Sequence, residues 1–473
     1  MSRDTVNDTP ITRIEELAEY IAQGAKPRSA WRIGTEHEKI PFYMEGNSPV
    51  PYDGPAGIRA ILEGMKARLG WDPIMDEGYI IGLVEPEKAN GISADLADSG
   101  KPTGPIAISL EPGGQFELSG APVASLHETC SETRAHMTQV REVAEPMGIR
   151  FLGVGGSPKW SYAETPRMPK SRAKIMTNYM PRVGKDGLNM MYRTCTVQVN
   201  LDFSSETDMR RKMQVGVKLQ PIATALFAMS PFTEGKPNGF LSWRSDIWRE
   251  TDNCRTGILP FIFSDDYGFA DYVEWALDVP MYFIIRDRHY IDCTHVTFRQ
   301  FMNGALKDTV PGDVPTIGDW ANHLTTTFPE VRLKRYIEMR GADVGPLRRI
   351  CALSAFWVGL LYDSEALNAA EALTRHWSYP EIRYLRDEVP IKGLHAILRN
   401  RSVLEIAREV LEISRTGLRN RAMLNSEGFD ETVYLAAIEE VIARGTTSAE
   451  EMLSQYNTIW GGSVEPAFVE YAY

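Results

Sequence analysis

The segment 196–203, TVQVNLDF, constrains the fold most, because it alternates strictly between apolar and polar residues. This is the pattern of a β-strand with one buried face. The polar face carries Thr196, Gln198, Asn200 and Asp202. An all-polar strand face is commonly just exposed to solvent. This face is also rich in oxygen ligands, which suits a hard cation or a polar substrate.

Two further strand-like segments place carboxylates in the same way. In 31–42, WRIGTEHEKIPF, alternation puts Glu36 and Glu38 on one face, where they repel each other unless a cation lies between them. In 106–120, IAISLEPGGQFELSG, Glu117 shares a face with Gln115, and Glu111 precedes a Pro-Gly-Gly turn. A solvated strand face and a turn-flanking acid are the alternative readings. Taken together, the segments offer the oxygen donors that Mg²⁺ prefers.

Two basic segments stand out in a chain with a net charge of −12. Residues 167–185 contain six basic side chains and no acid, and residues 241–257 contain Arg244, Trp248 and Arg255. Arginine forks match phosphate and carboxylate groups, so both segments are candidates for anion recognition. The alternatives are a solvated basic surface for the first segment and a structural cation–π pair for the second.

The coarse pattern predicts an α+β fold. Helices are expected over 11–22, 57–69 and 126–147, and strands over 31–40, 106–119 and 191–203, with a further strand cluster over 258–263 and 280–298. From about residue 319 the chain reads as mainly helical, including the apolar stretch 350–362. No regular βαβ repeat is present. We therefore expect one catalytic unit over 1–473, with a sheet-containing portion at 1–318 and an integral helical portion at 319–473.

The charge and the distribution of apolar residues restrict the expected cellular location and binding partners. The acidic balance, with a pI near 5.3, disfavours non-specific binding to nucleic acid or an anionic membrane. Residues 1–30 lack an apolar signal core, and their acids argue against a transit peptide. No apolar run reaches 18 residues, so we expect no transmembrane helix and a cytoplasmic protein. Walker A, H-E-x-x-H and G-x-S-x-G motifs are absent.

Long runs of the sequence resemble one family. GTEHEKIPF, SLEPGGQFELSGAP, MPKSRAKIMTNYMP, MYRTCTVQVNLDFSSE, LSWRSDIW, TDNCRTG and VRLKRYIEMRGAD look like glutamate–cysteine ligase of the plant and proteobacterial type, and the resemblance covers nearly the whole chain. It implies a glutamine-synthetase-like curved antiparallel sheet with surrounding helices. It also implies metal-binding glutamates at Glu36, Glu38, Glu111 and Glu117, and substrate- or nucleotide-binding roles for Arg172, Gln198 and Asn200. Arg244 and Arg255 would be the catalytic arginines near phosphate.

The resemblance further implies the reaction and its partners. The substrates would be ATP, L-glutamate and L-cysteine, with Mg²⁺ as cofactor, γ-glutamyl phosphate as intermediate, and a monomer or homodimer as the assembly. The lack of nucleophile motifs agrees with this chemistry, because phosphoryl transfer needs positioning and charge rather than a protein nucleophile. Another carboxylate–amine ligase of the same fold, or a non-catalytic nucleotide- or metal-binding relative, remains an open alternative.

Plant members of this family pair two sets of cysteines. Cys130 and Cys293 match one cysteine of each pair, and their partners would fall near Arg150 and Asp308, neither of which is cysteine. We therefore expect that the chain lacks this intramolecular disulfide switch and that its five cysteines are small buried or half-buried side chains.

Overall fold

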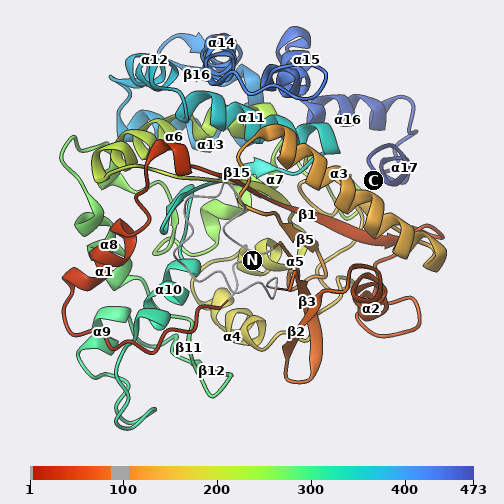
Figure 1. Cartoon of the computed structure of the whole chain (residues 1–473). Coiled ribbons are helices and arrows are strands. Elements are labelled where there is room, and N and C mark those ends of the chain that lie inside the picture. The colour runs from red at the N-terminus through yellow and green to blue at the C-terminus, as the bar shows by residue number, and fades with distance from the viewer. Residues whose placement is uncertain (1–3, 87–105) are drawn as a thin grey trace.

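The computed structural model describes residues 4–86 and 106–473, and at its centre lies a nine-stranded sheet (Figure 1). Neighbouring strands are antiparallel and follow the order β14-β15-β7-β1-β5-β4-β3-β2, while β6 pairs with the second half of β1. The strands are β1 (Ile33–Tyr43), β2 (Asp72–Asp76), β3 (Tyr79–Val84), β4 (Ala107–Leu110), β5 (Phe116–Ser119), β6 (Ile149–Leu152), β7 (Thr196–Leu201), β14 (Val331–Leu333) and β15 (Ile337–Asp343). The predicted α+β class with a large antiparallel sheet is confirmed.

The strand register brings the three predicted polar segments together. Glu38 on β1 lies opposite Glu117 on β5, and Glu36 lies opposite Gln198 on β7. Asn200 on β7 in turn lies opposite Glu338 on β15. Because side chains alternate along a strand, these residues line one face of adjacent strands. The sheet thus collects polar residues that lie up to about 300 positions apart in the sequence.

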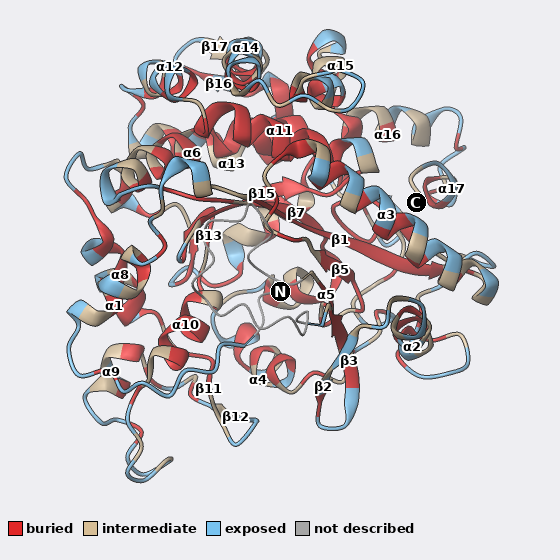
Figure 2. Ribbon diagram, in the orientation of Figure 1, coloured by how far each residue is buried: buried red, intermediate tan, exposed pale blue. Residues whose placement is uncertain are grey.

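The opposite face of the sheet is covered by three helices: α6 (Glu206–Phe227), α11 (Leu347–Leu361) and α3 (Leu126–Ala144). Every residue of α11 from Arg349 to Leu361 is buried, as Figure 2 shows. Thr35, which alternates with Glu36 on β1, points to this side and shares a 2.9 Å hydrogen bond with Ser354 of α11. A second helical layer covers α11: α12 (Ser364–Thr374), α14 (Val403–Arg421), α15 (Ala436–Arg444) and the turn η7 (Glu431–Leu435).

The polar face looks toward shorter elements. These are α4 (Ser171–Tyr179), α5 (Gly187–Arg193) and α7 (Trp243–Ile247). The remaining helices lie around the rim and at the C-terminal end: α1 (Glu15–Ala22), α2 (Ile58–Leu69), α8 (Phe269–Asp278), α9 (Phe298–Met302), α10 (Ile317–Thr325), α13 (Tyr379–Lys392), α16 (Ser448–Asn457) and α17 (Ala467–Glu470). Small two-stranded pairs involve β8 (Phe232–Thr233), β9 (Lys236–Pro237), β10 (Thr256–Gly257), β11 (Phe283–Arg286), β12 (His289–Asp292), β13 (Phe328–Pro329), β16 (Ile397–Leu398) and β17 (Arg401–Ser402).

Several boundaries differ from those the sequence predicts. The strand expected over 191–203 begins only at Thr196, because 187–193 forms α5. The strand expected over 258–263 is a 3₁₀ turn at Pro260–Phe263, where proline occupies the first turn. The sheet also extends beyond residue 318, since β14 and β15 belong to it. The mainly helical portion therefore starts near Leu347 rather than at 319.

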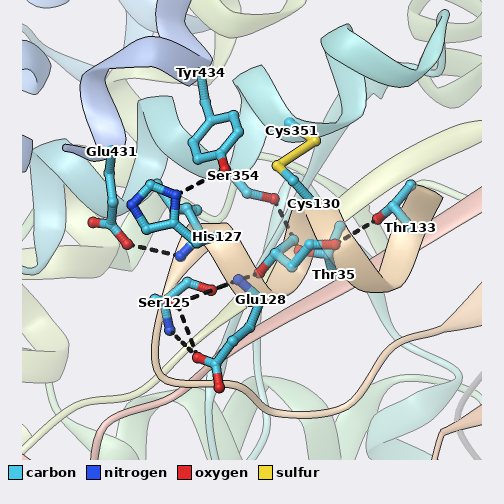
Figure 3. The surroundings of a disulfide bond; sticks show 12 residues. Thr35, Ser125, His127, Glu128, Cys130, Thr133, Cys351, Ser354, Glu431 and Tyr434 are labelled. Carbon is cyan, nitrogen blue, oxygen red and sulfur yellow. Dashed lines mark hydrogen bonds between the residues drawn. A yellow bond between two sulfur atoms is a disulfide. The ribbon is translucent and has the colours of Figure 1, made fainter. Parts of the chain in front are cut away.

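A disulfide joins two helices behind the sheet (Figure 3). Cys130 of α3 is bonded to Cys351 of α11, with their Cα atoms 5.7 Å apart. This corrects the expectation that Cys130 has no cysteine partner and is only a small buried side chain. The error lay in searching for the partner of Cys130 near Arg150, whereas the packing of α3 on α11 supplies a partner 221 residues away. Cys195, Cys254 and Cys293 are free thiols.

No single helix among residues 4–86 and 106–473 is long and apolar enough to cross a membrane; α11 and α12 meet the length and composition only as a pair bent by 88°.

Candidate active site

A cavity of about 90 Å³ lies between the polar face of the sheet and helices α4, α5 and α7. Three methionines and Trp248 supply apolar parts of its wall. Its charged lining consists of Glu36, Glu38, Glu111, Glu117, Arg172, Arg244, Arg332 and Arg340. Four acids and four arginines thus share one cavity. Of the nine site residues predicted from the sequence, seven line it, namely the four glutamates, Gln198, Arg172 and Arg244.

The acidic half of the cavity is built by β1, β4 and β5. The backbone N–H of Thr196 donates to Glu38 at 2.9 Å, and the Ser109 hydroxyl donates to Glu117 at 2.7 Å. Glu111 follows β4 in a tight turn, which Gly114 closes with a backbone hydrogen bond to the Glu111 carbonyl at 2.9 Å. Gly114 adopts φ = +88°, a conformation that side-chain-bearing residues rarely reach. The Pro-Gly-Gly turn therefore returns the chain so that Glu111 and Glu117 face the same space.

Burial and mutual repulsion dominate the electrostatics of this half. Burial, followed by the charges of Glu111 and Glu117, raises the pKa of Glu38 well above its usual range. Burial also raises the pKa of Glu111, and the nearby Lys170 offsets only part of that shift. Glu38 and Glu111 thus resist ionisation beside the Glu117 carboxylate, an arrangement that a bound cation would relieve.

The cavity offers oxygen donors that suit Mg²⁺, but the described side chains do not converge as a complete set of metal ligands. Within residues 4–86 and 106–473, no three acidic, histidine or cysteine side chains are arranged as a ready set of metal ligands. The donors facing the cavity are carboxylate and amide oxygens, which suit Mg²⁺ rather than Zn²⁺. Glu38, Glu111 and Glu117 are therefore the side chains that could hold the metal. Glu36 also lines the cavity, and the Asn200 amide donates to it at 2.9 Å.

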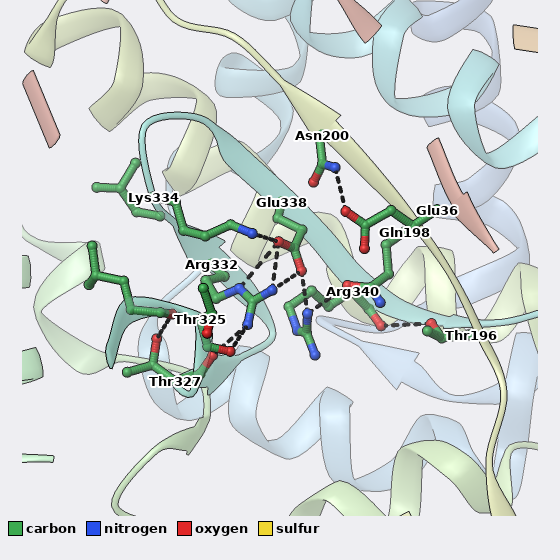
Figure 4. Close-up of polar contacts among 12 residues, drawn as sticks. Glu36, Thr196, Gln198, Asn200, Thr325, Thr327, Arg332, Lys334, Glu338 and Arg340 are labelled. Atoms are coloured by element: carbon green, nitrogen blue, oxygen red, sulfur yellow. Dashed lines mark hydrogen bonds and ion pairs between the residues drawn. The ribbon is translucent and has the colours of Figure 1, made fainter. Parts of the chain in front are cut away.

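The basic half of the cavity comes from β14 and β15 (Figure 4). Glu338 is fully buried, and Arg332 donates three hydrogen bonds to it, at 2.7 and 2.8 Å from one terminal nitrogen and at 3.2 Å from Nε. Lys334 lies 2.9 Å from Glu338, and Arg340 donates to both Glu338 and Gln198. Burial alone would raise the pKa of Glu338, but these three cations hold it well below its usual range. We call this group, Arg332, Lys334, Glu338 and Arg340, the charged seam.

The arginines of the cavity differ in how many of their donors are occupied. Arg332 is committed, since it also donates to the carbonyls of Thr325 and Thr327 at 2.8 and 3.0 Å. Arg244 donates from one terminal nitrogen to the Arg340 carbonyl at 2.9 Å, while its other terminal nitrogen has no partner among the described residues. Arg172 is 5% exposed, and the acid paired with it, Asp4, is 3.7 Å away. Arg244 and Arg172 therefore have unused capacity for an anion.

Two predicted residues lie outside the cavity lining. Asn200 reaches the site only through its hydrogen bond to Glu36. Arg255 is fully buried elsewhere: it bonds Asp252 at 2.6 Å and the carbonyls of Thr326 and Pro280 at 3.0 and 2.7 Å. Its guanidinium also stacks 3.8 Å from the ring centre of Tyr282. The structure does not bring Arg255 together with Arg244.

Sequence reasoning missed the charged seam, although a signal for it exists. The run VRLKRYIEMR alternates Arg332, Lys334, Glu338 and Arg340 at every second or fourth position, as the polar face of a hairpin would. This run contributed only to the family resemblance and fell within the portion predicted to be mainly helical. Gln115 was recognised only as a neighbour of Glu117, yet its amide donates to the Thr194 carbonyl at 2.9 Å and it lines the cavity.

The chain is similar in fold and in sequence to enzymes of the ligase class. The chain is similar to the crystal structure of glutamate–cysteine ligase from Francisella tularensis in complex with AMP, with a TM-score of 0.53 at 12% identity, over 90% of this chain and 85% of that one. The model of glutamate–cysteine ligase family 2 matches residues 32–470. Chloroplastic glutamate–cysteine ligase A from Oryza sativa subsp. indica is 53% identical over 98% of this chain and 88% of its own length. The chloroplastic enzyme of Arabidopsis thaliana is 53% identical over 98% of this chain and 83% of its own length.

The chain therefore belongs to glutamate–cysteine ligase family 2. It is an enzyme of the ligase class, and its reaction is the first step of glutathione biosynthesis.

The comparisons correct one expectation. We predicted a cytoplasmic location from the lack of an apolar signal core and from the acids near the N-terminus. The relatives from Oryza sativa, Arabidopsis thaliana and Nicotiana tabacum, at 52–53% identity, are named chloroplastic enzymes. That finding overturns the cytoplasmic prediction.

Proposed function

We propose that the chain joins the γ-carboxylate of L-glutamate to the amine of L-cysteine at the expense of ATP, with Mg²⁺ as cofactor. A carboxylate does not condense with an amine in neutral water unless it is activated. The γ-phosphoryl group of ATP would first pass to the glutamate γ-carboxylate, giving γ-glutamyl phosphate and ADP. The cysteine amine would then attack the acyl carbon, lose a proton and release phosphate.

The observation that carries this proposal is that one cavity holds both carboxylates and arginines with unused donors. Glu38, Glu111 and Glu117 offer carboxylates, and Arg244 and Arg172 offer unused guanidinium N–H groups in the same cavity. Bound Mg²⁺ would neutralise charge on the phosphates and polarise the transferring group. The carboxylates would hold that metal, and the arginines would orient the anionic substrates and stabilise charge during transfer.

The residues whose polar groups already bond to other protein groups have a different role in this scheme. The charged seam fixes Arg340 beside Gln198. We propose that Gln198 faces the nucleotide, as the resemblance implies. We propose that Asn200 orients Glu36 rather than touching the nucleotide. We propose Arg255 as a positioning residue, because its hydrogen bonds to Asp252 and Thr326 join the loop after α7 to the segment that carries Phe328.

Phosphate release from ATP tests the proposal and separates the alternatives. With purified protein and Mg²⁺, we expect rapid release only when glutamate and cysteine are both present. Glycine in place of cysteine is the control, because it offers an amine without the thiol side chain. Equal rates with glycine would identify another amine ligase, and no glutamate-dependent release would identify a non-catalytic relative. Replacing Mg²⁺ by EDTA should abolish release.

A further inference from the structure

A second cavity lies on the helical side of the molecule. Its volume is about 100 Å³, similar to that of the active-site cavity, and the two share no lining residue. It is formed where the start of α11 meets α15, α16 and the C-terminal segment. Its polar lining consists of Arg348, Arg349, Arg444, Ser448, Glu451 and Tyr471. Three arginines line the cavity, and one of them, Arg349, forms no ion pair with a described residue. Its volume exceeds what a single water needs.

The floor of the cavity is a buried arginine with no acidic partner. Arg349 is 6% exposed, and its terminal nitrogens donate to the Ser448 hydroxyl at 3.1 Å and the Leu226 carbonyl at 3.0 Å. Its Nε has no hydrogen-bond partner, and no carboxylate forms an ion pair with it, among the residues the structure describes. A buried guanidinium held only by neutral groups is costly, so a counter-ion in the adjoining cavity would be favourable.

The nearest acid is already occupied. Of the neighbouring charges, that of Asp343 acts most strongly on Arg349, but its carboxylate accepts hydrogen bonds from Met229, Ser230 and Ser242 at 2.7–2.9 Å. Burial lowers the pKa of Arg349 to about 10, so the side chain still carries its charge at neutral pH. The charge therefore persists without a directly bonded neutralising group.

The other two arginines lie at the rim of the cavity, and each is paired with an acidic side chain. Arg348 makes two hydrogen bonds with the exposed Glu440, at 2.7 and 2.6 Å, and Arg444 pairs with Glu451 at 2.9 Å. The helix α11 also begins here, 15 residues long, and its N-cap residue Pro346 provides no side-chain cap. Uncapped N–H groups and the helix dipole add to the attraction for an anion.

We propose that this cavity is a binding site for a small oxyanion, a tetrahedral phosphate- or sulfate-type group or a carboxylate, held by Arg349 and Ser448 at the floor and admitted past Arg348 and Arg444. The site is separate from the active-site cavity. It does not depend on the reaction proposed above, since it concerns binding alone.

Crystals of the full chain soaked in sodium selenate test the proposal directly. We expect anomalous selenium density within hydrogen-bond distance of the Arg349 guanidinium. Soaks in malonate distinguish a carboxylate from a tetrahedral anion, because planar density at the same place would identify the former. Clear density for this region with neither anion present would overturn the proposal.

Thermal unfolding gives the matching solution test. At constant ionic strength, replacing chloride by sulfate should raise the melting temperature of the wild-type protein by about 2 °C or more beyond the rise seen in Arg349→Gln. The comparison cancels the general stabilising effect of sulfate. Arg244→Gln is the control for anion binding in the active-site cavity and should keep the extra rise.

If Arg349→Gln does not fold, Ser448→Ala combined with Arg444→Gln replaces it, with the same expectation of a smaller rise. An equal rise in the wild type and in the folded variant would overturn the proposal.

Discussion

The carboxylates of the active-site cavity differ in what already occupies their oxygens. Glu36 accepts from the Asn200 side chain and Glu38 from a backbone N–H, whereas Glu117 accepts from the Ser109 hydroxyl. Each of these hydrogen bonds can orient a carboxylate toward a metal without using its charge. The arginines differ in the same way. Arg332 donates to protein acceptors, whereas one terminal nitrogen of Arg244 has no partner among the described residues.

The first prediction concerns Glu117. Glu117→Gln keeps the shape of the side chain but removes the charge that a divalent cation requires, so kcat should fall at least about 100-fold. The melting temperature should stay close to that of the wild type, and activity should not recover at high Mg²⁺. Glu45→Gln, at an exposed position, is the control and should be fully active. Near-normal turnover of folded Glu117→Gln would remove Glu117 from the metal site.

The second prediction concerns Arg255. Arg255→Ala leaves Asp252, which is 1% exposed, as a buried charge without its partner, so the free energy of unfolding should fall by roughly 3–5 kcal/mol. Lysine should restore only part of it, because one ammonium cannot replace three directed hydrogen bonds. Urea denaturation measures the change, with the exposed Arg13→Ala as control. A loss of about 10³-fold in kcat with unchanged stability would instead show that Arg255 stabilises the phosphoryl group.

At the scale of elements, three interactions hold the helices and strands around the site. The disulfide fastens α3 to α11 behind β1, and the Thr35–Ser354 hydrogen bond joins the same α11 to the strand that carries Glu36. On the other face, the charged seam joins β14, β15 and β7. The elements around the site are therefore held together by a disulfide, a hydrogen bond and the ion pairs of the charged seam.

The third prediction concerns the disulfide. Cys130 and Cys351 close a loop of about 220 residues, and reduction should lower the free energy of unfolding by about 2–4 kcal/mol. Guanidinium unfolding with and without dithiothreitol measures this, and non-reducing gels report the bond. Cys351→Ser should unfold like the reduced protein, whereas Cys254→Ser, at an exposed free thiol, should behave like the wild type. Identical unfolding of oxidised and reduced protein would contradict the prediction.

The fourth prediction concerns the pH dependence of the charged seam. The pKa of Glu338 is depressed, so its contribution is fully present above its unfolded pKa of about 4.3 and is lost as the pH falls through the folded value. At pH 7, Glu338→Gln should lower the free energy of unfolding by roughly 3–5 kcal/mol. The difference from the wild type should narrow below about pH 4.

Urea denaturation across this pH range measures the free energy of unfolding of the wild type and of Glu338→Gln, with Glu409→Gln as control. Glu409 pairs with Arg401 at an exposed site, so that variant should change stability by less than about 1 kcal/mol. A constant difference between wild type and Glu338→Gln from pH 7 to 3 would show that the seam is not held by charge.

At the scale of the whole molecule, the helical C-terminal portion is part of the sheet domain. The buried helix α11 covers β1 and β7, and α14 covers α11 in turn. The apolar faces of α6, α11 and the central strands form one continuous core. The two portions predicted from the sequence are thus not separable units.

The fifth prediction follows from this shared core. A chain cut after Pro346 should not fold by itself, because it would expose the sheet face that α11 covers. We expect residues 1–346 to be insoluble or to lack a cooperative thermal transition. Co-expression with residues 347–473 should restore soluble, active protein. A cooperative transition of the isolated 1–346 fragment would show that the two portions fold independently.

Local sequence patterns by themselves determined several strands and one turn of this protein. Alternation predicted strands at 31–40, 106–119 and 191–203, and the Pro-Gly-Gly sequence predicted the turn beside Glu111, because these patterns depend only on neighbouring residues. Resemblance supplied the family and the reaction. The cytoplasmic prediction rested on the composition near the N-terminus and was wrong, because a targeting signal is recognised by other proteins and is not a property of the fold.

Only the tertiary structure decided which of these residues meet. The seam needed β14 and β15 to add to the sheet beside β7, and the disulfide needed α3 to pack on α11 across 221 residues. Arg255 and Arg244 look alike in sequence, yet burial gives one a full set of protein partners and leaves the other a free N–H at the cavity. Burial and long-range pairing depend on the packing of distant segments, and local sequence does not contain that information.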